Sequence, residues 1–125
     1  MKLTAQQLNR ATLGRQLLLV REDIGVVDAI HRVCALQAQS PASPYIALWN
    51  RVTNFDPGDL DRAFAANKVI KATLIRIALH VVTAADYPAF HRAMVHILRA
   101  ARLHDSRFTG TGLSIAEADA LSRKC

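Results

Sequence analysis

The sequence has little of what marks a secreted, membrane-spanning or metal-binding protein. It contains two cysteines, Cys34 and Cys125, which are far apart in the chain. We therefore expect free thiols in a reducing compartment, the cytoplasm, and no cysteine metal set. No stretch approaches the roughly 18 consecutive apolar residues that cross a bilayer. The polar start of the chain also lacks the apolar core of a signal peptide.

Internal repeats and low-complexity segments are absent as well. Of the 125 residues, 51% are apolar and 21% are charged, which is typical of a folded protein and not of a disordered one. A chain of this length is expected to form one ordinary domain with a full hydrophobic core.

Acidic residues are almost missing from residues 62–104. Between residues 62 and 104 there is one acid, Asp86, so this stretch carries the whole net charge of +6. A one-sided basic half indicates a polyanionic partner, nucleic acid first, and the alternative is a basic surface without a partner. The basic residues of this stretch are Arg62, Lys68, Lys71, Arg76, Arg92, Arg99 and Arg102.

Capping motifs predict helices that begin near Thr4, Ser43 and Asp56. Thr4 and Gln7 form a capping box, and the helix that follows is expected to run for about four turns. Ser43 precedes a proline at the first helical position. The side chains expected to bury the helix after Ser43 are Ile46, Leu48, Trp49 and Val52.

A further helix is predicted upstream of Pro41. On this interpretation Gln37 closes a core-facing stripe, and Pro41 ends the helix by about Gln39. In a continuing helix the side chains of Gln37 and Gln39 would diverge by about 200°. In an extended exit they would point the same way. The stripe consists of Val27, Ile30, Val33, Cys34 and Gln37.

Residues 69–82 (VIKATLIRIALHVV) are rich in β-branched residues and contain neither proline nor glycine. We predict two strands in a hairpin that turns near Ile75 to Ala78, with a single buried helix as the alternative. A long helix is expected to follow, capped by Asp86 or Thr83. Its outer side carries Arg92, His96, Arg99 and Arg102.

The last part of the chain is predicted to be a loop, residues 105–113, and a helix opened by a capping box at Ser114. Because that helix stops at Cys125, we expect the chain to be a fragment or a natural truncation. The predicted fold is mainly α with a β-hairpin, a winged helix-turn-helix over residues 1–105. Residues 106–125 are predicted to be a linker and the start of a truncated helix or domain.

Two blocks of the sequence resemble the winged-helix DNA glycosylases of the AlkZ type. The first block is Leu36–Pro41 (LQAQSP) with Pro44–Trp49 (PYIALW), and the second is Lys71–Arg76 (KATLIR) with Leu79–Tyr87 (LHVVTAADY). The resemblance covers roughly residues 3 to 105. It implies tandem winged-helix domains that remove alkylated or crosslinked bases, typically N7-alkylguanine, from double-stranded DNA.

The resemblance also implies a set of site residues. The catalytic motif of the family is glutamine, an apolar residue, then glutamine or aspartate, which places it at Gln37 and Gln39. It implies phosphate contacts for Lys71 and Arg76, whose alternative is a solvated strand face, and a DNA contact or site-shaping role for His80, whose alternative is packing. This chain departs from the family, whose members are usually much longer. It also has Ile77 where a glycine often follows the arginine.

The chemistry of glutamine fits such a reaction. An amide does not titrate, so it cannot be a general base, but it donates and accepts hydrogen bonds. An N7-alkylated purine is already cationic and leaves without a general acid. Amide dipoles could then place a water and stabilise the developing positive charge of the sugar. The alternative for Gln37 and Gln39 is a polar helix end that caps backbone groups.

Other functions remain open from the sequence. The chain could be a non-catalytic winged-helix DNA-binding module or a regulator-like fragment, or its basic face could serve protein contacts. We expect no cofactor, and no metal site at His91, His96 and His104, because their spacing is not that of metal ligands.

Overall fold

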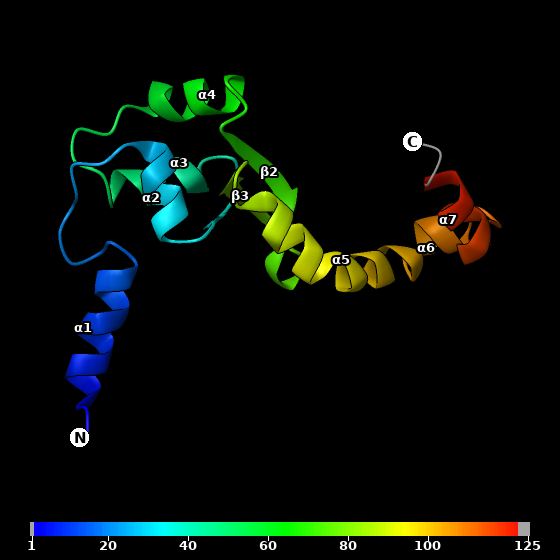
Figure 1. The fold of residues 1–125 in the computed structure, drawn as a ribbon, viewed down its shortest axis with the longest axis horizontal. Helices are drawn as coiled ribbons and strands as arrows, with labels where there is room; N and C mark the ends of the chain where they lie inside the picture. Colours follow the sequence, from blue (N-terminus) through cyan, green and yellow to red (C-terminus); the bar gives the residue numbers. More distant parts are fainter. Residues whose placement is uncertain (1, 123–125) are drawn as a thin grey trace.

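Three short helices packed on a small antiparallel sheet form the centre of the molecule. The computed structural model describes residues 2–122 (Figure 1). The sheet has the strand order β1-β3-β2, in which β3 pairs with both neighbours. The strands are β1 (Leu36–Gln37), β2 (Val69–Thr73) and β3 (Leu79–Thr83). The packed helices are α2 (Val26–Arg32), α3 (Ser43–Trp49) and α4 (Pro57–Ala65). This is the winged helix-turn-helix predicted from the sequence, with α3 and α4 as the helix pair and the β2–β3 hairpin as the wing.

The hydrophobic core lies between these helices and one face of the sheet. Side chains alternate between the faces of a strand, so Leu36, Val69 and Val81 point from the three strands into this core. The core cluster consists of Leu17, Val26, Ala29, Ile30, Val33, Leu36, Ala38, Leu48, Val52, Leu60, Ala63, Val69 and Val81. This continuous cluster holds the strands against the helices.

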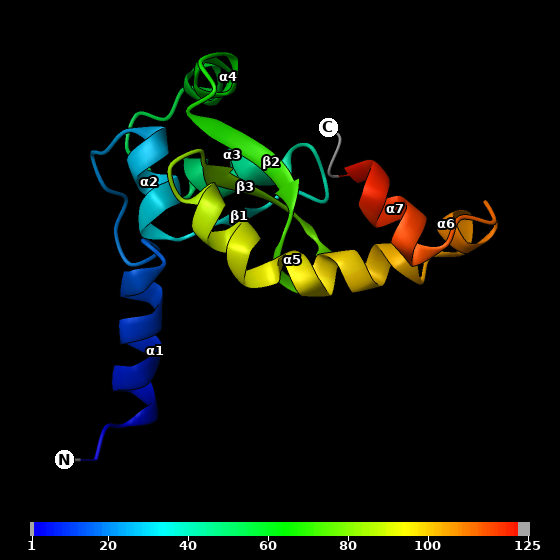
Figure 2. The same cartoon turned by 45° about the vertical axis from the view of Figure 1, so that its right-hand side comes forward.

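Two parts of the chain extend from this centre. Helix α1 (Ala5–Arg15) projects away and buries none of its residues, although Leu17 behind it is anchored in the core (Figures 1 and 2). Helix α5 (Tyr87–Leu103) starts after β3, contacts the tip of the wing and leads away to α6 (Ser106–Thr109) and α7 (Ile115–Ser122).

The main correction to the sequence-based prediction concerns residues 33–39. Helix α2 ends at Arg32, Cys34 adopts a left-handed φ of 73°, and Leu36–Gln37 form a strand. Cys34 and Gln37 are therefore exposed and do not belong to a core-facing helical stripe. The physical reason is the open side of β3, whose backbone groups pair with this segment; the Ala38 N–H donates to the Leu79 carbonyl at 2.7 Å.

Smaller corrections affect the helices. Helix α1 ends at Arg15, after 11 residues and not four turns. Trp49 and Ile46 were expected in the core but are 54% and 57% exposed, and the Arg21 guanidinium lies 4.4 Å from the centroid of the Trp49 ring. An arginine can cover an exposed ring in this way because the ring face attracts a cation.

From residue 86 onward the structure also differs in part from the sequence-based prediction. Asp86 precedes α5 but makes no side-chain capping bond, because its carboxylate is taken up by other partners. Helix α6 lies inside the segment predicted as a loop. The capping box at Ser114 is confirmed by its bonds with Glu117, and the predicted helical residues 123–125 lie outside the described part of the chain.

The wing hairpin is confirmed, with its turn where the sequence predicted it. A single turn of 3-10 helix, η1 (Ile75–Ile77), joins the strands, and the Leu74 N–H donates to the Ala78 carbonyl at 3.0 Å. Arg76 and Ile77 have φ values of 55° and 60°. A β-branched side chain is strained in this left-handed region, where glycine is not.

Replacing Ile77 by glycine is expected to stabilise the wing. Relief of the left-handed strain is worth about 1–2 kcal/mol, and the added freedom of glycine in the unfolded chain costs about 0.5–1 kcal/mol. A net gain on the order of 1 kcal/mol should raise the urea midpoint measured by circular dichroism. Ile75→Gly is the matched control, because Ile75 lacks a positive φ, and it should destabilise. Equal destabilisation by both variants would contradict the claim that the backbone of Ile77 is strained.

Candidate functional site

Gln37 and Gln39 project from the same side of an extended segment. Along residues 36–39 burial alternates: Leu36 and Ala38 are 4% and 0% exposed, whereas both glutamines are exposed. This is the extended exit in which the sequence analysis expected both side chains to point the same way. The backbone thus brings the two predicted catalytic residues onto one surface.

The two glutamines differ in how firmly they are held. The side-chain oxygen of Gln39 accepts a bond from the Leu79 N–H at 3.3 Å, at the base of the wing. Within residues 2–122 the side chain of Gln37 has no hydrogen-bond partner. An amide offers two acceptor positions and two donors, so both side chains retain capacity for a ligand.

His80 lies beside Gln37 but is largely buried. The two residues are opposite each other in the β1–β3 register and therefore share a face of the sheet. His80 is 9% exposed, and its Nδ1 lies 2.9 Å from the Ala78 carbonyl, which accepts a hydrogen bond from the ring. This position favours the packing and site-shaping roles over a direct phosphate contact.

Gln39 also lines a cavity of about 350 Å³ between the wing and the end of α5. The wing contributes Thr73, Ile77 and Leu79 to its wall. The other side is formed by Ala101, Arg102, Asp105 and Arg107. Sequence reasoning gave Asp105 and Arg107 no role, because they lie in a segment predicted as a loop and carry no motif.

Asp105 and Arg107 form a two-pronged ion pair in this cavity. The Asp105 carboxylate accepts bonds from Arg107 Nε at 2.9 Å and from Arg107 Nη2 at 2.6 Å. These bonds, the Arg107 backbone N–H and the nearby charge of Arg102 hold the pKa of Asp105 well below its usual range. Asp105 therefore stays ionised and orients the Arg107 guanidinium.

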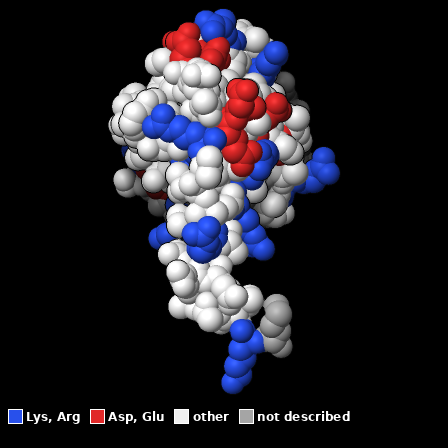
Figure 3. Space-filling model, turned by 90° about the vertical axis from the view of Figure 1, so that its left-hand side faces the viewer, with Lys and Arg blue, Asp and Glu red and all other residues white. Residues whose placement is uncertain are grey.

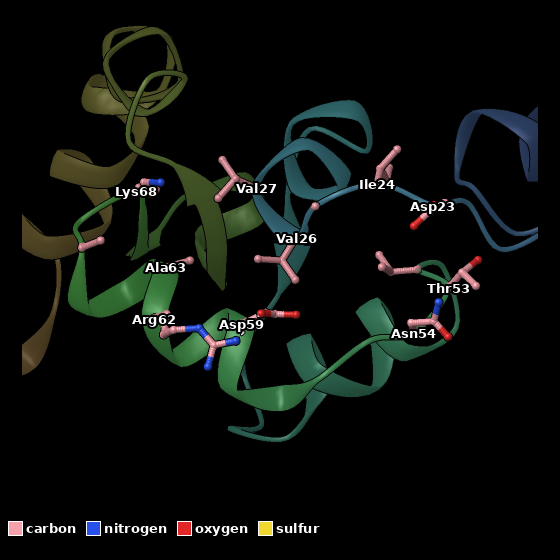
Figure 4. Close-up of a pocket in the computed structure, with 13 residues that line it drawn as sticks. Asp23, Ile24, Val26, Val27, Thr53, Asn54, Asp59, Arg62, Ala63 and Lys68 are labelled. Carbon is pink, nitrogen blue, oxygen red and sulfur yellow. Dashed lines mark hydrogen bonds and ion pairs between the residues drawn. The ribbon is translucent and has the colours of Figure 1, made fainter.

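A second cavity, of about 680 Å³, lies away from the glutamines (Figure 4). It is bounded by the segment before α2, by residues 52–54 and by α4, and none of its lining residues belongs to β1 or the wing. In Figure 4 the side chains of Asp59 and Arg62, which form an ion pair, lie close together on its α4 side. This cavity is therefore separate from the two glutamines.

The helix-turn-helix and the wing differ in the sign of their charge. Helix α4 and its cap carry Asp56, Asp59 and Asp61 but one basic residue, Arg62, which pairs with two of these acids. Acidic side chains gather at the upper end of the face in Figure 3, where α4 lies. In many helix-turn-helix proteins the second helix enters the major groove. An acidic helix repels phosphate, so α4 is poorly suited to that position.

The wing and α5, by contrast, carry exposed basic side chains and no acidic residue. Lys71 and Arg76 are exposed on β2 and the wing turn, and Arg92 and Arg102 are exposed on α5. This distribution agrees with the basic half recognised in the sequence. No cluster of potential metal ligands occurs among the residues that the structure describes, and none of the described helices is long and apolar enough to span a membrane.

A small polar cluster ties α2 to the start of α5. His31 Nδ1 lies 2.7 Å from the Asp86 carboxylate, and the Thr83 hydroxyl donates to the same carboxylate at 2.6 Å. Hydrogen bonding and charge from Asp86 raise the pKa of His31 above its usual 6.5. Bonds from Thr83 and His31 lower the pKa of Asp86 below its usual 3.8. This pairing joins residues 55 positions apart and was not predicted from the sequence.

These features define a winged-helix domain with two exposed glutamines where β1 leaves the sheet and with a basic wing. The family model described as DNA glycosylase AlkZ-like matches residues 30–124. The chain therefore belongs to the AlkZ-like DNA glycosylase family, as the motifs indicated.

A solved structure gives an independent comparison of the fold. The chain is similar to the Streptomyces sahachiroi DNA glycosylase AlkZ, with a TM-score of 0.81 and 21% sequence identity. The match covers 99% of this chain and 33% of that one, so the present chain spans a third of its length. A search of curated proteins finds no matching sequence.

The His31–Asp86 pair should give a distinct pH dependence. Because the folded pKa of His31 is raised, its stabilisation is complete below about pH 6.5 and is lost as pH rises through the folded pKa. Because the folded pKa of Asp86 is lowered, its stabilisation is present above about pH 3.8 and is lost as pH falls through the folded pKa.

An NMR titration of the His31 ring checks this prediction. The pKa of His31 should lie above 6.5 in the unmodified chain and fall in Asp86→Asn, which keeps the shape of the side chain and removes its charge. An unchanged His31 pKa in the variant would show that the pair does not form in solution.

Proposed function

We propose that this chain is the winged-helix part of a cytoplasmic DNA glycosylase. The enzyme would hydrolyse the N-glycosidic bond of alkylated bases, either N7-alkylguanine or crosslinked bases. The single observation that carries the proposal is the placement of Gln37 and Gln39 on one side of an extended segment at the base of the wing. Membership of the AlkZ-like family supports it, as does the similarity to a DNA glycosylase of known structure.

The proposed mechanism uses amide dipoles and no proton transfer by the protein. A cationic base leaves without protonation, and positive charge develops on the sugar. The carbonyl oxygens of Gln37 and Gln39 would face that charge and orient an attacking water, whose oxygen bonds to the sugar carbon as the bond to the base breaks and whose proton passes to solvent. Gln39 is held by Leu79, which reduces the reorganisation needed at the moment of reaction. Neutral bases should be poor substrates, because neither glutamine can donate a proton to the leaving group.

Double-stranded DNA would approach the wing and α5. Lys71 and Arg76 would contact phosphates, which positions the duplex without reading its sequence. His80, buried beside Gln37, would support the strand that presents the glutamine. The acidic helix α4 would remain outside the groove.

A second candidate function is a non-catalytic winged-helix DNA-binding module. It is favoured by one observation, that the wing and α5 carry exposed basic residues and no acidic ones, which is enough for duplex binding without catalysis. The two functions share the basic wing and differ in the task of the glutamines.

Substitution of both glutamines by alanine tests the catalytic proposal. In Gln37→Ala/Gln39→Ala, release of 7-methylguanine from alkylated duplex should fall by about 10²–10³-fold, the loss typical of removing a stabilising transition-state dipole. Duplex affinity should change little, because the glutamines carry no charge. Gln6→Ala, on exposed α1, is the control and should leave release unchanged.

The outcomes separate the two candidates. If the unmodified chain binds duplex but releases no base, the non-catalytic module is correct for this chain. If binding collapses together with release in the double variant, the glutamines have a structural role.

Salt dependence tests the DNA-binding face. Lys71→Gln and Arg76→Gln should each weaken duplex binding and lower the slope of log affinity against log salt by about 1. Arg10→Gln removes a charge from α1, away from the wing, and should leave the slope unchanged. Equal slopes in all variants would exclude Lys71 and Arg76 as phosphate contacts.

A further inference from the structure

Charged residues that are distant from Gln39 in the sequence lie beside it in the wall of one cavity. Arg102, at the end of α5, and Arg107, in α6, line the same cavity as Gln39. Asp105 is the third charged residue in its wall, so the cavity carries a net charge of +1. An inference about its ligand rests on the proposed function and extends it.

We propose that this cavity holds the sugar–phosphate of the target nucleotide, with Arg102 and Arg107 binding the adjoining phosphate while Gln39 faces the sugar. The two arginines are then positioning residues for the reaction. Their task differs from that of Lys71 and Arg76, which would grip the duplex outside the cavity.

The hydrogen-bonding capacity of the arginines fits a phosphate. A guanidinium has five N–H donors, and the pairing with Asp105 uses Nε and one proton of Nη2. The remaining three donors of Arg107 are available in a plane that Asp105 keeps fixed. Arg102 forms no ion pair among residues 2–122 and is exposed. Arginine forks match phosphate geometry and give strong, oriented bonds.

The size and the walls of the cavity fit part of one nucleotide. Its volume of about 350 Å³ lies at the lower end of the range for small-ligand sites, too small for a stacked duplex. The target nucleotide must therefore leave the stack to enter. Apolar side chains of Ile77, Leu79 and Ala101 form walls against which a sugar ring can pack.

A purely local role explains only part of this arrangement. Asp105 also accepts the Arg107 backbone N–H at 2.9 Å, as a cap of the short helix α6. Capping accounts for the Asp105–Arg107 pair, but it does not account for a second arginine, Arg102, in a shared cavity with Gln39.

The test compares two short duplexes, one undamaged and one with a tetrahydrofuran abasic analogue, which presents an exposed sugar–phosphate without a base. The complete chain should bind the abasic duplex more tightly. Arg102→Gln and Arg107→Gln should each reduce this preference roughly tenfold, the effect of losing one charged hydrogen bond. Arg107→Lys keeps the charge but not the planar fork, and it should also reduce the preference.

Arg92→Gln is the matched control, since Arg92 is exposed on α5 and does not line the cavity. It should weaken binding of both duplexes equally and keep the preference. If the unmodified chain shows no preference, or if the Arg102 and Arg107 variants lose affinity for both duplexes equally, the cavity assignment is overturned while the DNA-binding function stands. If the unmodified chain binds neither duplex at low salt, the proposed function fails as well.

Discussion

The backbone pairing between residues 36–38 and β3 is the constraint on which the candidate site depends. Without it, the chain after α2 would have no partner for its peptide groups and the glutamines no fixed direction. The Ala38–Leu79 hydrogen bond closes the pairing at the base of the wing. The same residue, Leu79, then donates its own N–H to the Gln39 side chain. One residue of β3 thus fixes both the backbone and the side chain at this point.

A second constraint is the division of charge within a common fold. The helix that usually enters the groove is acidic here, whereas the wing and α5 carry basic residues and no acidic ones. Under the proposed function, a duplex that follows this field would meet the molecule beside β1 and the wing. Affinity would then come from the basic residues and chemistry from the adjacent glutamines, since Gln37 and Gln39 are neutral and add little long-range attraction.

Local signals in the sequence predicted the parts of the fold that depend on neighbouring residues. The capping boxes at Thr4 and Ser114 and the hairpin turn near Ile75 lie where they were expected. Strand β1 was not predicted because a strand of two residues is too short to show an alternating pattern. Its conformation depends on pairing with β3, some 40 residues later in the chain. The exposure of Trp49 and the position of Asp105 and Arg107 beside Gln39 also went unpredicted. Each depends on contacts that spacing along the chain does not record.

The hydrogen bond between Gln39 and Leu79 would also couple the wing to the proposed chemistry. Leu79 is the first residue of β3 and follows directly on the turn in which Arg76 and Ile77 adopt left-handed backbone. Movement of that turn by a bound duplex would shift the N–H that holds the glutamine. It would shift Ile77 and Leu79 as walls of the Gln39 cavity at the same time. A wing that is strained when free and is pressed by DNA when bound would therefore set the position of Gln39 and the shape of its cavity together.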